Sequence, residues 1–240
     1  MNEAAPDYAV PALDKALDIL ELLADRAGGL TQSEIAEAVG RSASQIFRVL
    51  ARLERRGYIL RDRQSGLYLF STRMFDLANR HPPLRGLIQL AIAPMRDLAN
   101  RVEQSCNLSV LDADAVRVIA QVESPADFGY RVRVGAAFPV ETTATGAVLV
   151  SGAREDVRSR FPQAASAEIA AAGFLSRPDS LQAGITDVVV AIIDATGHTV
   201  AALTVPYVAT TFSALDADAV LTAARATSAV IGDRLRGNPI

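Results

Sequence analysis

Apolar residues recur at every third or fourth position in two segments near the start of the chain, a spacing that predicts amphipathic helices. The first segment runs from Pro11 to Asp25, and Gly28–Gly29 stops it. Thr31 then begins a second helix with Glu34 three residues later, a capping-box pattern in which each side chain bonds the other residue's free backbone amide. Gly40 is placed to take the left-handed conformation that ends this helix.

A third helix follows after a turn of about three residues, because Ser42 and Gln45 repeat the capping pattern. Two helices joined by so short a turn have the layout of a helix-turn-helix. At about 100° per residue, one side of the third helix is apolar and the opposite side is polar and cationic. The apolar side comprises Ile46, Val49, Leu50 and Leu53, and the opposite side comprises Ser44, Arg48, Arg52 and Arg55.

Two short strands are predicted after this helix, at Tyr58–Leu60 and Leu67–Phe70, joined by the polar turn Arg61–Gly66. Three helices followed by such a hairpin form the winged helix-turn-helix, whose usual task is to bind DNA. The same fold is sometimes reused for protein contacts, and this alternative stays open.

Charge supports the DNA-binding interpretation locally, although the net charge of the chain is -3. Between Gly40 and Arg63 only Glu54 and Asp62 are acidic, whereas the arginines are Arg41, Arg48, Arg52, Arg55, Arg56, Arg61 and Arg63. An ordinary solvated helix surface is the alternative interpretation, but such a surface usually mixes acidic with basic residues.

Side chains near the N-terminal end of a recognition helix point into the major groove. Here these are Ser42, Ala43, Ser44, Gln45 and Arg48, and we expect Gln45 to bond adenine and Arg48 to bond guanine. Arg52 and Arg55 lie farther along the helix and are expected to touch phosphate. Arg61 and Arg63 on the wing are expected to reach the DNA backbone or minor groove.

The rest of the chain alternates predicted helices with strands. A short helix over Ser71–Asn79 precedes a domain boundary at His81–Pro83, where His81 is interpreted as a hinge or surface residue. Predicted helices then cover Leu84–Gln104, Thr142–Ser151, Arg154–Arg160, Ala164–Ala172 and Ala214–Leu235, and predicted strands cover Asn107–Leu111, Val116–Val122, Tyr130–Val134, Val188–Ile193 and Thr199–Pro206, with a loop at Gly135–Pro139. Hairpins flanked by helices indicate an antiparallel sheet with helices packed on it, an α+β domain.

Composition excludes several classes of function. The 240 residues are 50% hydrophobic, which allows a sizeable core, yet no apolar run approaches the ~20 residues of a membrane span. Cys106 is the single cysteine, so no intrachain disulfide forms, and with only His81 and His198 a metal site or histidine-driven catalysis is disfavoured. Asp112 and Asp114 fit a turn better than a catalytic pair. We therefore expect no enzyme, no cofactor and no bound metal, and, without a signal pattern, a cytoplasmic location.

Motifs along almost the whole chain are similar to those of the IclR (isocitrate lyase regulator) family of bacterial transcriptional regulators. They are Ala12–Leu20, Ile35–Gly40, Arg48–Glu54 and Gly57–Tyr58 in the first part, and Gly135, Thr142–Leu149, Ala183–Ile185 and Ala201–Val205 in the second. Two positions depart from the family. Members commonly have Pro-Leu-His before the small-residue helix and a cysteine after the Gly-Ile pair, where this chain has Pro139–Glu141 and Asp187.

The resemblance implies a winged helix-turn-helix domain over residues 1–70, a linker helix over 71–83 and a GAF-like effector-binding and oligomerisation domain over 84–240. It implies an effector site at Ala144, Thr145, Arg177, Asp187, Thr204 and Pro206. We expect a small organic acid there, preferably an aromatic one, held by Arg177 or by the amides of a helix N-terminus, with a hydroxyl or amine donating to Asp187. A structural Arg177–Asp187 ion pair or an exposed Arg177 is the alternative.

The predicted function is a regulator whose binding to double-stranded operator DNA is controlled by that effector. Because one winged helix makes a small contact, a two-fold dimer is expected, and the resemblance adds tetramers. The alternative function is a small-molecule-binding or catalytic α+β domain whose winged helix serves assembly.

Overall fold

The computed structural model describes residues 10–80, 82–180, 182–210, 213 and 215–237. Contacts divide the chain into two units, Met1–His81 and Pro82–Ile240. The predicted linker over residues 71–83 contains a helix that belongs to the first unit. It also contains His81, and this residue lies outside the described part of the chain. The role of this segment as a linker stays a prediction.

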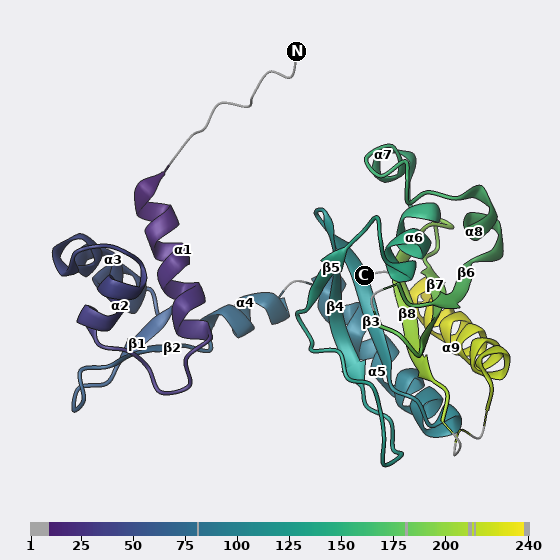
Figure 1. The fold of residues 1–240 in the computed structure, drawn as a ribbon. Coiled ribbons are helices and arrows are strands. Elements are labelled where there is room, and N and C mark those ends of the chain that lie inside the picture. Colours follow the sequence, from purple (N-terminus) through teal and green to yellow (C-terminus); the bar gives the residue numbers. More distant parts are fainter. Residues whose placement is uncertain (1–9, 81, 181, 211–212, 214, 238–240) are drawn as a thin grey trace. The chain divides into compact units, whose positions relative to one another are not determined.

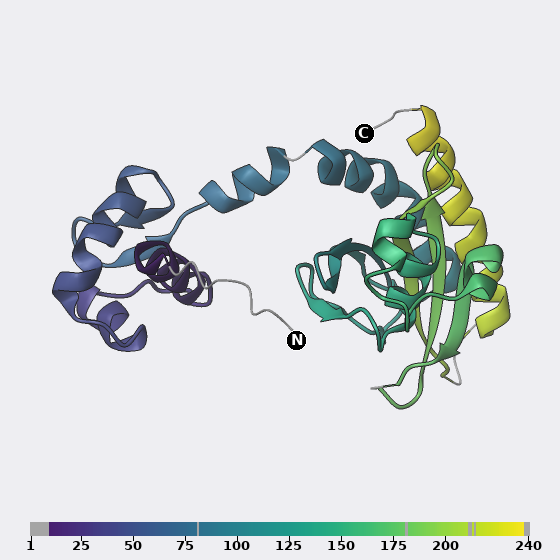
Figure 2. The ribbon, with the colours of Figure 1, turned by 90° about the horizontal axis from the view of Figure 1, so that it is seen from above.

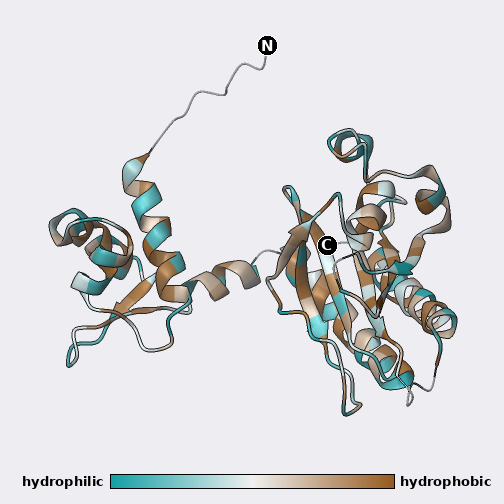
Figure 3. Cartoon of the chain, viewed as in Figure 1, coloured by the Kyte–Doolittle hydropathy of each residue, from teal (hydrophilic) through white to brown (hydrophobic). Residues whose placement is uncertain are grey.

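The first unit is a winged helix-turn-helix (Figure 1). Its elements are α1 (Pro11–Ala24), α2 (Gln32–Ala38), α3 (Ala43–Arg55), β1 (Ile59–Arg61), β2 (Tyr68–Phe70) and α4 (Arg73–Arg80). Its core is formed by Ile19, Leu20, Leu23, Ile35, Ala36, Ile46, Leu50, Leu53, Ile59 and Tyr68. Figure 3 shows hydrophobic and hydrophilic bands alternating along α1, as expected for a helix with one buried side.

The two capping features predicted for α2 are present in the structure. Thr31 and Glu34 form the capping box of α2, with the Thr31 amide donating to the Glu34 carboxylate at 2.8 Å. Gly40 has a φ of 61°, the left-handed conformation expected where the chain leaves α2 for the turn. These local bonds satisfy helix-end amides and define the turn between α2 and α3.

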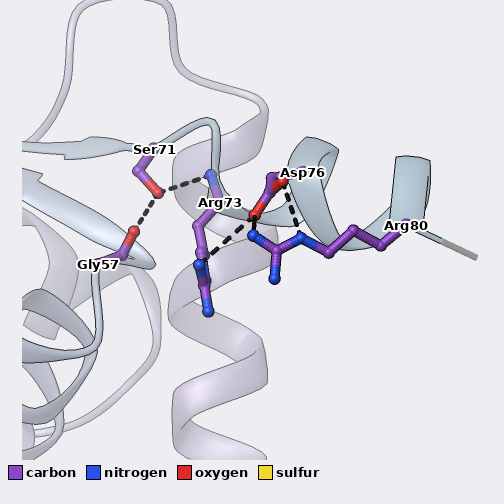
Figure 4. Close-up of polar contacts among 5 residues, drawn as sticks. All are labelled: Gly57, Ser71, Arg73, Asp76 and Arg80. Carbon is purple, nitrogen blue, oxygen red and sulfur yellow. Dashed lines mark hydrogen bonds and ion pairs between the residues drawn. The ribbon is translucent and has the colours of Figure 1, made fainter.

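Hydrogen bonds at Ser71 tie the start of α4 to the wing (Figure 4). The Ser71 hydroxyl donates to the Gly57 carbonyl at 2.5 Å and accepts from the Arg73 amide at 3.1 Å. Within α4, the Asp76 carboxylate lies 2.8 Å from Arg80 and 3.5 Å from Arg73. The beginning of α4 is therefore anchored to the first unit.

The second unit is a six-stranded antiparallel sheet with helices on both faces. The strands, in the order β5-β4-β3-β8-β7-β6, are β3 (Cys106–Asp112), β4 (Ala115–Val122), β5 (Ala137–Pro139), β6 (Phe174–Pro178), β7 (Ile185–Ile193) and β8 (Thr199–Val208). The helices are α5 (Pro82–Val102), α6 (Ala144–Ser151), α7 (Glu155–Arg158), α8 (Ala167–Ala172) and α9 (Ala217–Gly237).

The two faces of the sheet bury separate cores. Along β7, Val188, Val190 and Ile192 join the core under α5 and α9, whereas Val189 and Ala191 join the core under α6. Figure 2 shows α9 and α6 on opposite sides of β7 and β8. Because both faces are covered, the strand is continuously apolar instead of alternating, which explains the longest apolar run of the chain.

Two parts of the predicted sheet were wrong. Residues 130–134 form no strand; the edge strand is β5, in the segment predicted as a loop, and it pairs Ala137 with Arg117 of β4. Gly135, with a φ of 88°, donates to the Val118 carbonyl, so the chain turns there and joins the sheet only after it. Strand β6, which pairs with β7, was missed. In the described part of the chain, no helix is long and apolar enough to cross a membrane.

Candidate functional site

The third helix of the first unit presents an unpaired cationic face. Ile46, Leu50 and Leu53 of α3 are buried in the core, and the opposite side exposes Ser44, Arg48, Arg52 and Arg55. None of the ion pairs among the described residues involves Arg48, Arg52 or Arg55. Their charges are thus available to an anionic partner.

Polar residues at the N-terminal end of α3 bond to one another. The Ser42 amide donates to the Gln45 side-chain oxygen at 3.0 Å, and the Ser42 and Ser44 hydroxyls lie 3.1 Å apart. A glutamine that bonds adenine in two places uses its oxygen and its NH₂ group together. In the free protein the Gln45 oxygen already serves as a helix cap, so the predicted contact requires that oxygen to be shared or released.

The wing carries two exposed arginines around a turn that is held by hydrogen bonds. Asp62 accepts from the amides of Gln64 at 2.6 Å and Ser65 at 3.0 Å, and these bonds, that of Ser65 foremost, lower the pKa of its carboxyl group. The Arg61 guanidinium lies 5.2 Å from the centre of the Tyr68 ring, and Arg63 is exposed within the turn. Arg41 is exposed between α2 and α3.

A cavity of about 80 Å³ lies in the second unit between the sheet and the start of α6. Four of the predicted effector residues line it, namely Thr145, Asp187, Thr204 and Pro206. The Thr145 and Thr204 hydroxyls lie 3.0 Å apart and are buried. Apolar side chains, including Val116, Val118, Phe138 and Ile185, complete much of the wall.

Two carboxylates meet at this cavity, because Asp179 lines it beside Asp187. Burial raises the pKa of the Asp187 carboxyl group to about 6, and the negative charge of Asp179 and a hydrogen bond from it add to the effect. Arg177 opposes the shift. The Asp187 carboxyl group therefore gains or loses its proton near pH 6, and once ionised its oxygens can accept hydrogen bonds.

The other two predicted effector residues do not line the cavity. Arg177 is the cross-strand neighbour of Asp187, yet the two form no ion pair in the described part of the chain, and the Arg177 guanidinium donates to the Thr142 carbonyl at 3.2 Å. Ala144 is buried in the core under α6. Glu141, the second acidic departure from the family, is exposed.

Sequence reasoning missed Asp179 and one residue of α3. Asp179 follows the unpredicted strand β6, so no pattern placed it near Asp187. Phe47 is a large apolar side chain exposed on α3, and the helical wheel of that segment alone was enough to single it out.

Two family models match the chain: the IclR helix-turn-helix domain over residues 12–63, and the bacterial transcriptional regulator IclR C-terminal domain over residues 84–183. The chain belongs to the IclR family of bacterial transcriptional regulators. The predicted family and fold class are thereby confirmed. Both of the matching family models describe transcriptional regulators, and neither describes a catalytic family.

Among curated relatives, the transcriptional regulator KdgR of Escherichia coli is 29% identical over 147 residues, covering 61% of this chain and 55% of its own length. BhcR of Paracoccus denitrificans is 34% identical over 115 residues, covering 48% and 41%. The match thus spans about half the length of these curated relatives.

Solved structures agree in fold with this IclR-family chain. An IclR homolog from Microbacterium hydrocarbonoxydans, complexed with 4-hydroxybenzoate, has a TM-score of 0.76 at 20% identity, covering 95% of this chain and 100% of that one. The Thermotoga maritima IclR has a TM-score of 0.73 at 21% identity, covering 93% and 98%. At these identities the likeness supports the fold alone.

Proposed function

We propose that this chain is a transcriptional regulator that binds double-stranded operator DNA through α3 and the wing, under the control of a small-molecule effector held in the second unit. The observation that carries the proposal is the unpaired arginine face of α3, opposite a buried apolar face. Membership of the IclR family supports it. A cytoplasmic location, where bacterial DNA lies, follows from the same proposal.

The arginines have two roles in this proposal. Each phosphate that Arg52, Arg55 or the wing arginines neutralise releases condensed counterions, which gives affinity without sequence preference. Arg48 lies closer to the N-terminal end of α3, where side chains reach base edges, and a guanidinium bonds guanine in two places. Affinity and specificity are therefore separable by mutation.

The experiment compares Arg48→Ala with Arg55→Ala by fluorescence anisotropy. The probes are a duplex selected from a random library by the wild-type protein and a scrambled duplex of equal length. Arg48→Ala is expected to weaken binding to the selected duplex by about 1 to 3 kcal/mol and to reduce the base preference at one position. Arg55→Ala is expected to weaken binding to both duplexes and to lower the slope of log affinity against log salt concentration by about one.

Arg96→Ala, which removes an exposed charge from α5, is the matched control and should leave the affinity for both duplexes unchanged. Equal losses for Arg48→Ala and Arg55→Ala on scrambled DNA contradict the base-contacting role of Arg48. A wild-type protein that selects no DNA contradicts the function itself.

The proposed effector is a small organic acid that also carries a hydroxyl or amine. Asp187 and Asp179 supply acceptors for that donor, and Thr145 and Thr204 supply a polar wall. The carboxylate would face the first turn of α6, where the Arg177 guanidinium also lies against the Thr142 carbonyl. The 4-hydroxybenzoate bound by the Microbacterium hydrocarbonoxydans homolog, an aromatic acid with a hydroxyl, belongs to this chemical class.

Thermal-shift screening of the intact protein tests this class, because a ligand that binds only the folded state raises the melting temperature. The library contains hydroxy- and amino-substituted acids, the same acids without the donor group, and amines or polyols without the carboxylate. We expect shifts from the first set alone. Calorimetry on Arg177→Ala with the ligand found then decides whether that side chain holds the carboxylate, since unchanged affinity assigns the anion to the helix amides.

Self-association is the remaining part of the proposal. Leu13 and Leu17 on α1 and Met74 and Phe75 on α4 are exposed apolar residues of the first unit. Large apolar side chains exposed to solvent are candidates for a protein contact. A homodimer that presents two winged helices to two half-sites fits these surfaces, and pairing of dimers into tetramers stays a prediction.

A further inference from the structure

Phe47 occupies an unusual place on α3. Its side chain is 55% exposed, and it does not belong to the buried core of the first unit. At about 100° per residue it lies roughly 60° around the helix from Ser44 and on one row with Ala43 and Ala51, which are also exposed. Phe47 thus extends the cationic face of α3 with an apolar row.

The fold of the first unit does not account for an aromatic ring at this position. The core side of α3 is filled by Ile46, Leu50 and Leu53, all of them buried. Phe47 is instead exposed to solvent, between the core side and the cationic side of α3, so the ring contributes contact area that the isolated unit leaves unused.

The neighbouring charges narrow the class of partner. An apolar protein surface placed on Phe47 would also cover the unpaired guanidinium of Arg48, at a desolvation cost that no counter-charge offsets. The DNA major groove offers both chemistries together, phosphates and guanine for arginine, and the thymine C5-methyl group for an apolar side chain. Phe47 is the fifth residue of the 13-residue helix, within the half that approaches base edges in helix-turn-helix proteins.

We propose that Phe47 contacts the C5-methyl group of a thymine in the major groove and so sets a preference for thymine at one position of each half-site. The inference rests on the proposed DNA-binding function and adds to it a specificity-determining residue. Ala43 and Ala51, on either side along the row, leave room for the ring to lie against the base edge.

The experiment replaces thymine by deoxyuridine, one position at a time, in the duplex selected by the wild-type protein. This change removes the methyl group and leaves every hydrogen-bonding group of the base in place. Burial of one methyl group corresponds to a change in affinity of roughly fourfold. We expect the wild-type protein to lose about this factor at one thymine of each half-site.

Phe47→Ala should bind the thymine duplex at least about fourfold more weakly than the wild-type protein does. Its affinity should not change further when deoxyuridine replaces thymine at the contacted position. Phe47→Leu, which keeps an apolar side chain, should retain part of the sensitivity. The salt slope should be unchanged in both variants, because no phosphate contact is removed. Phe128→Ala, which removes an exposed phenylalanine from the second unit, is the matched control and should keep the wild-type sensitivity.

Three outcomes overturn the inference. Equal deoxyuridine sensitivity in Phe47→Ala and wild type means that another residue contacts the methyl group. Insensitivity of the wild-type protein at every thymine means that no methyl group is contacted. Loss of self-association in Phe47→Ala, measured by light scattering, together with equal weakening on all duplexes, assigns the ring to a protein contact. Failure of the wild-type protein to bind any duplex refutes the proposed function instead, and so is distinguishable.

Discussion

Replacing Asp187 by asparagine tests whether folding places a carboxylate at the cavity wall at a cost in stability. The pKa of this carboxyl group is raised from 3.8 to about 6, first by burial and then by Asp179. Because the folded state holds the proton more tightly than the unfolded state, its contribution to stability is fully present below pH 3.8. That contribution is lost as the pH rises toward 6 and is absent above it.

The size of the effect follows from the same values. The difference between 3.8 and about 6 corresponds to an upper bound of about 3 kcal/mol. Asp187 is only partly buried, so screening by water reduces the expected cost to roughly 1 to 2 kcal/mol. Asp187→Asn has nearly the same shape but no charge, and it should therefore be more stable than wild type by about this amount at pH 7.5. The melting temperature should rise by roughly 2 to 8 °C.

The assay is thermal unfolding of both proteins between pH 4 and pH 7.5, without ligand. The gain in stability of Asp187→Asn over wild type should shrink as the pH falls through 6. It should vanish near pH 4, where the folded wild-type protein holds Asp187 in the neutral form and so resembles the variant. Asp179→Asn should weaken the pH dependence without abolishing it, because burial is the larger cause. Asp127→Asn, an exposed control, should behave as wild type. A difference between Asp187→Asn and wild type that is the same at every pH refutes the reasoning.

Three further predictions concern packing, thiol chemistry and assembly. Gly146→Ala should destabilise the second unit by about 1 to 3 kcal/mol in urea, because its Cβ would lie 2.0 Å from the Val140 carbonyl oxygen; unchanged stability would mean that α6 shifts freely. Burial raises the pKa of the Cys106 thiol to about 12, so a thiol reagent at pH 8 should label it only after denaturation, and rapid native labelling would instead indicate a redox-accessible site. Leu13→Glu should weaken self-association in light scattering, whereas Leu60→Glu, on the wing, should not; equal effects would remove α1 from the contact.

The features predicted correctly are those encoded by neighbours in the sequence. The capping box of α2 involves residues three apart, and the two faces of α3 follow from helical periodicity alone. The paired strands β7 and β8 were predicted because their apolar runs flank the turn-forming segment Asp194–His198. In each case the signal lies within a few residues of the structure that it specifies.

The strands that were misplaced lie at the edges of the sheet, where local signals are weak. Tyr130–Val134 alternates apolar with polar residues as a strand does, but no neighbouring strand pairs with it; Tyr130 and Val132 line the cavity instead. Strand β6 is short and contains Arg177 and Pro178, so its composition suggests a loop. Only pairing with β7 makes it a strand, and that pairing depends on the tertiary structure and not on the local sequence.

The chemistry of the cavity follows from the same tertiary pairing. The register of β6 on β7 sets Arg177 opposite Asp187 and leaves Asp179 at the strand end, beside the same cavity. Sequence alone suggested that Arg177 and Asp187 would neutralise each other or hold two ends of a ligand. The fold instead directs Arg177 to the Thr142 carbonyl and gives Asp187 a second carboxylate as its neighbour. A ligand that donates a hydrogen bond to the Asp187 carboxylate favours the ionised form of that group, so the affinity of the ligand and the pKa of Asp187 are thermodynamically linked.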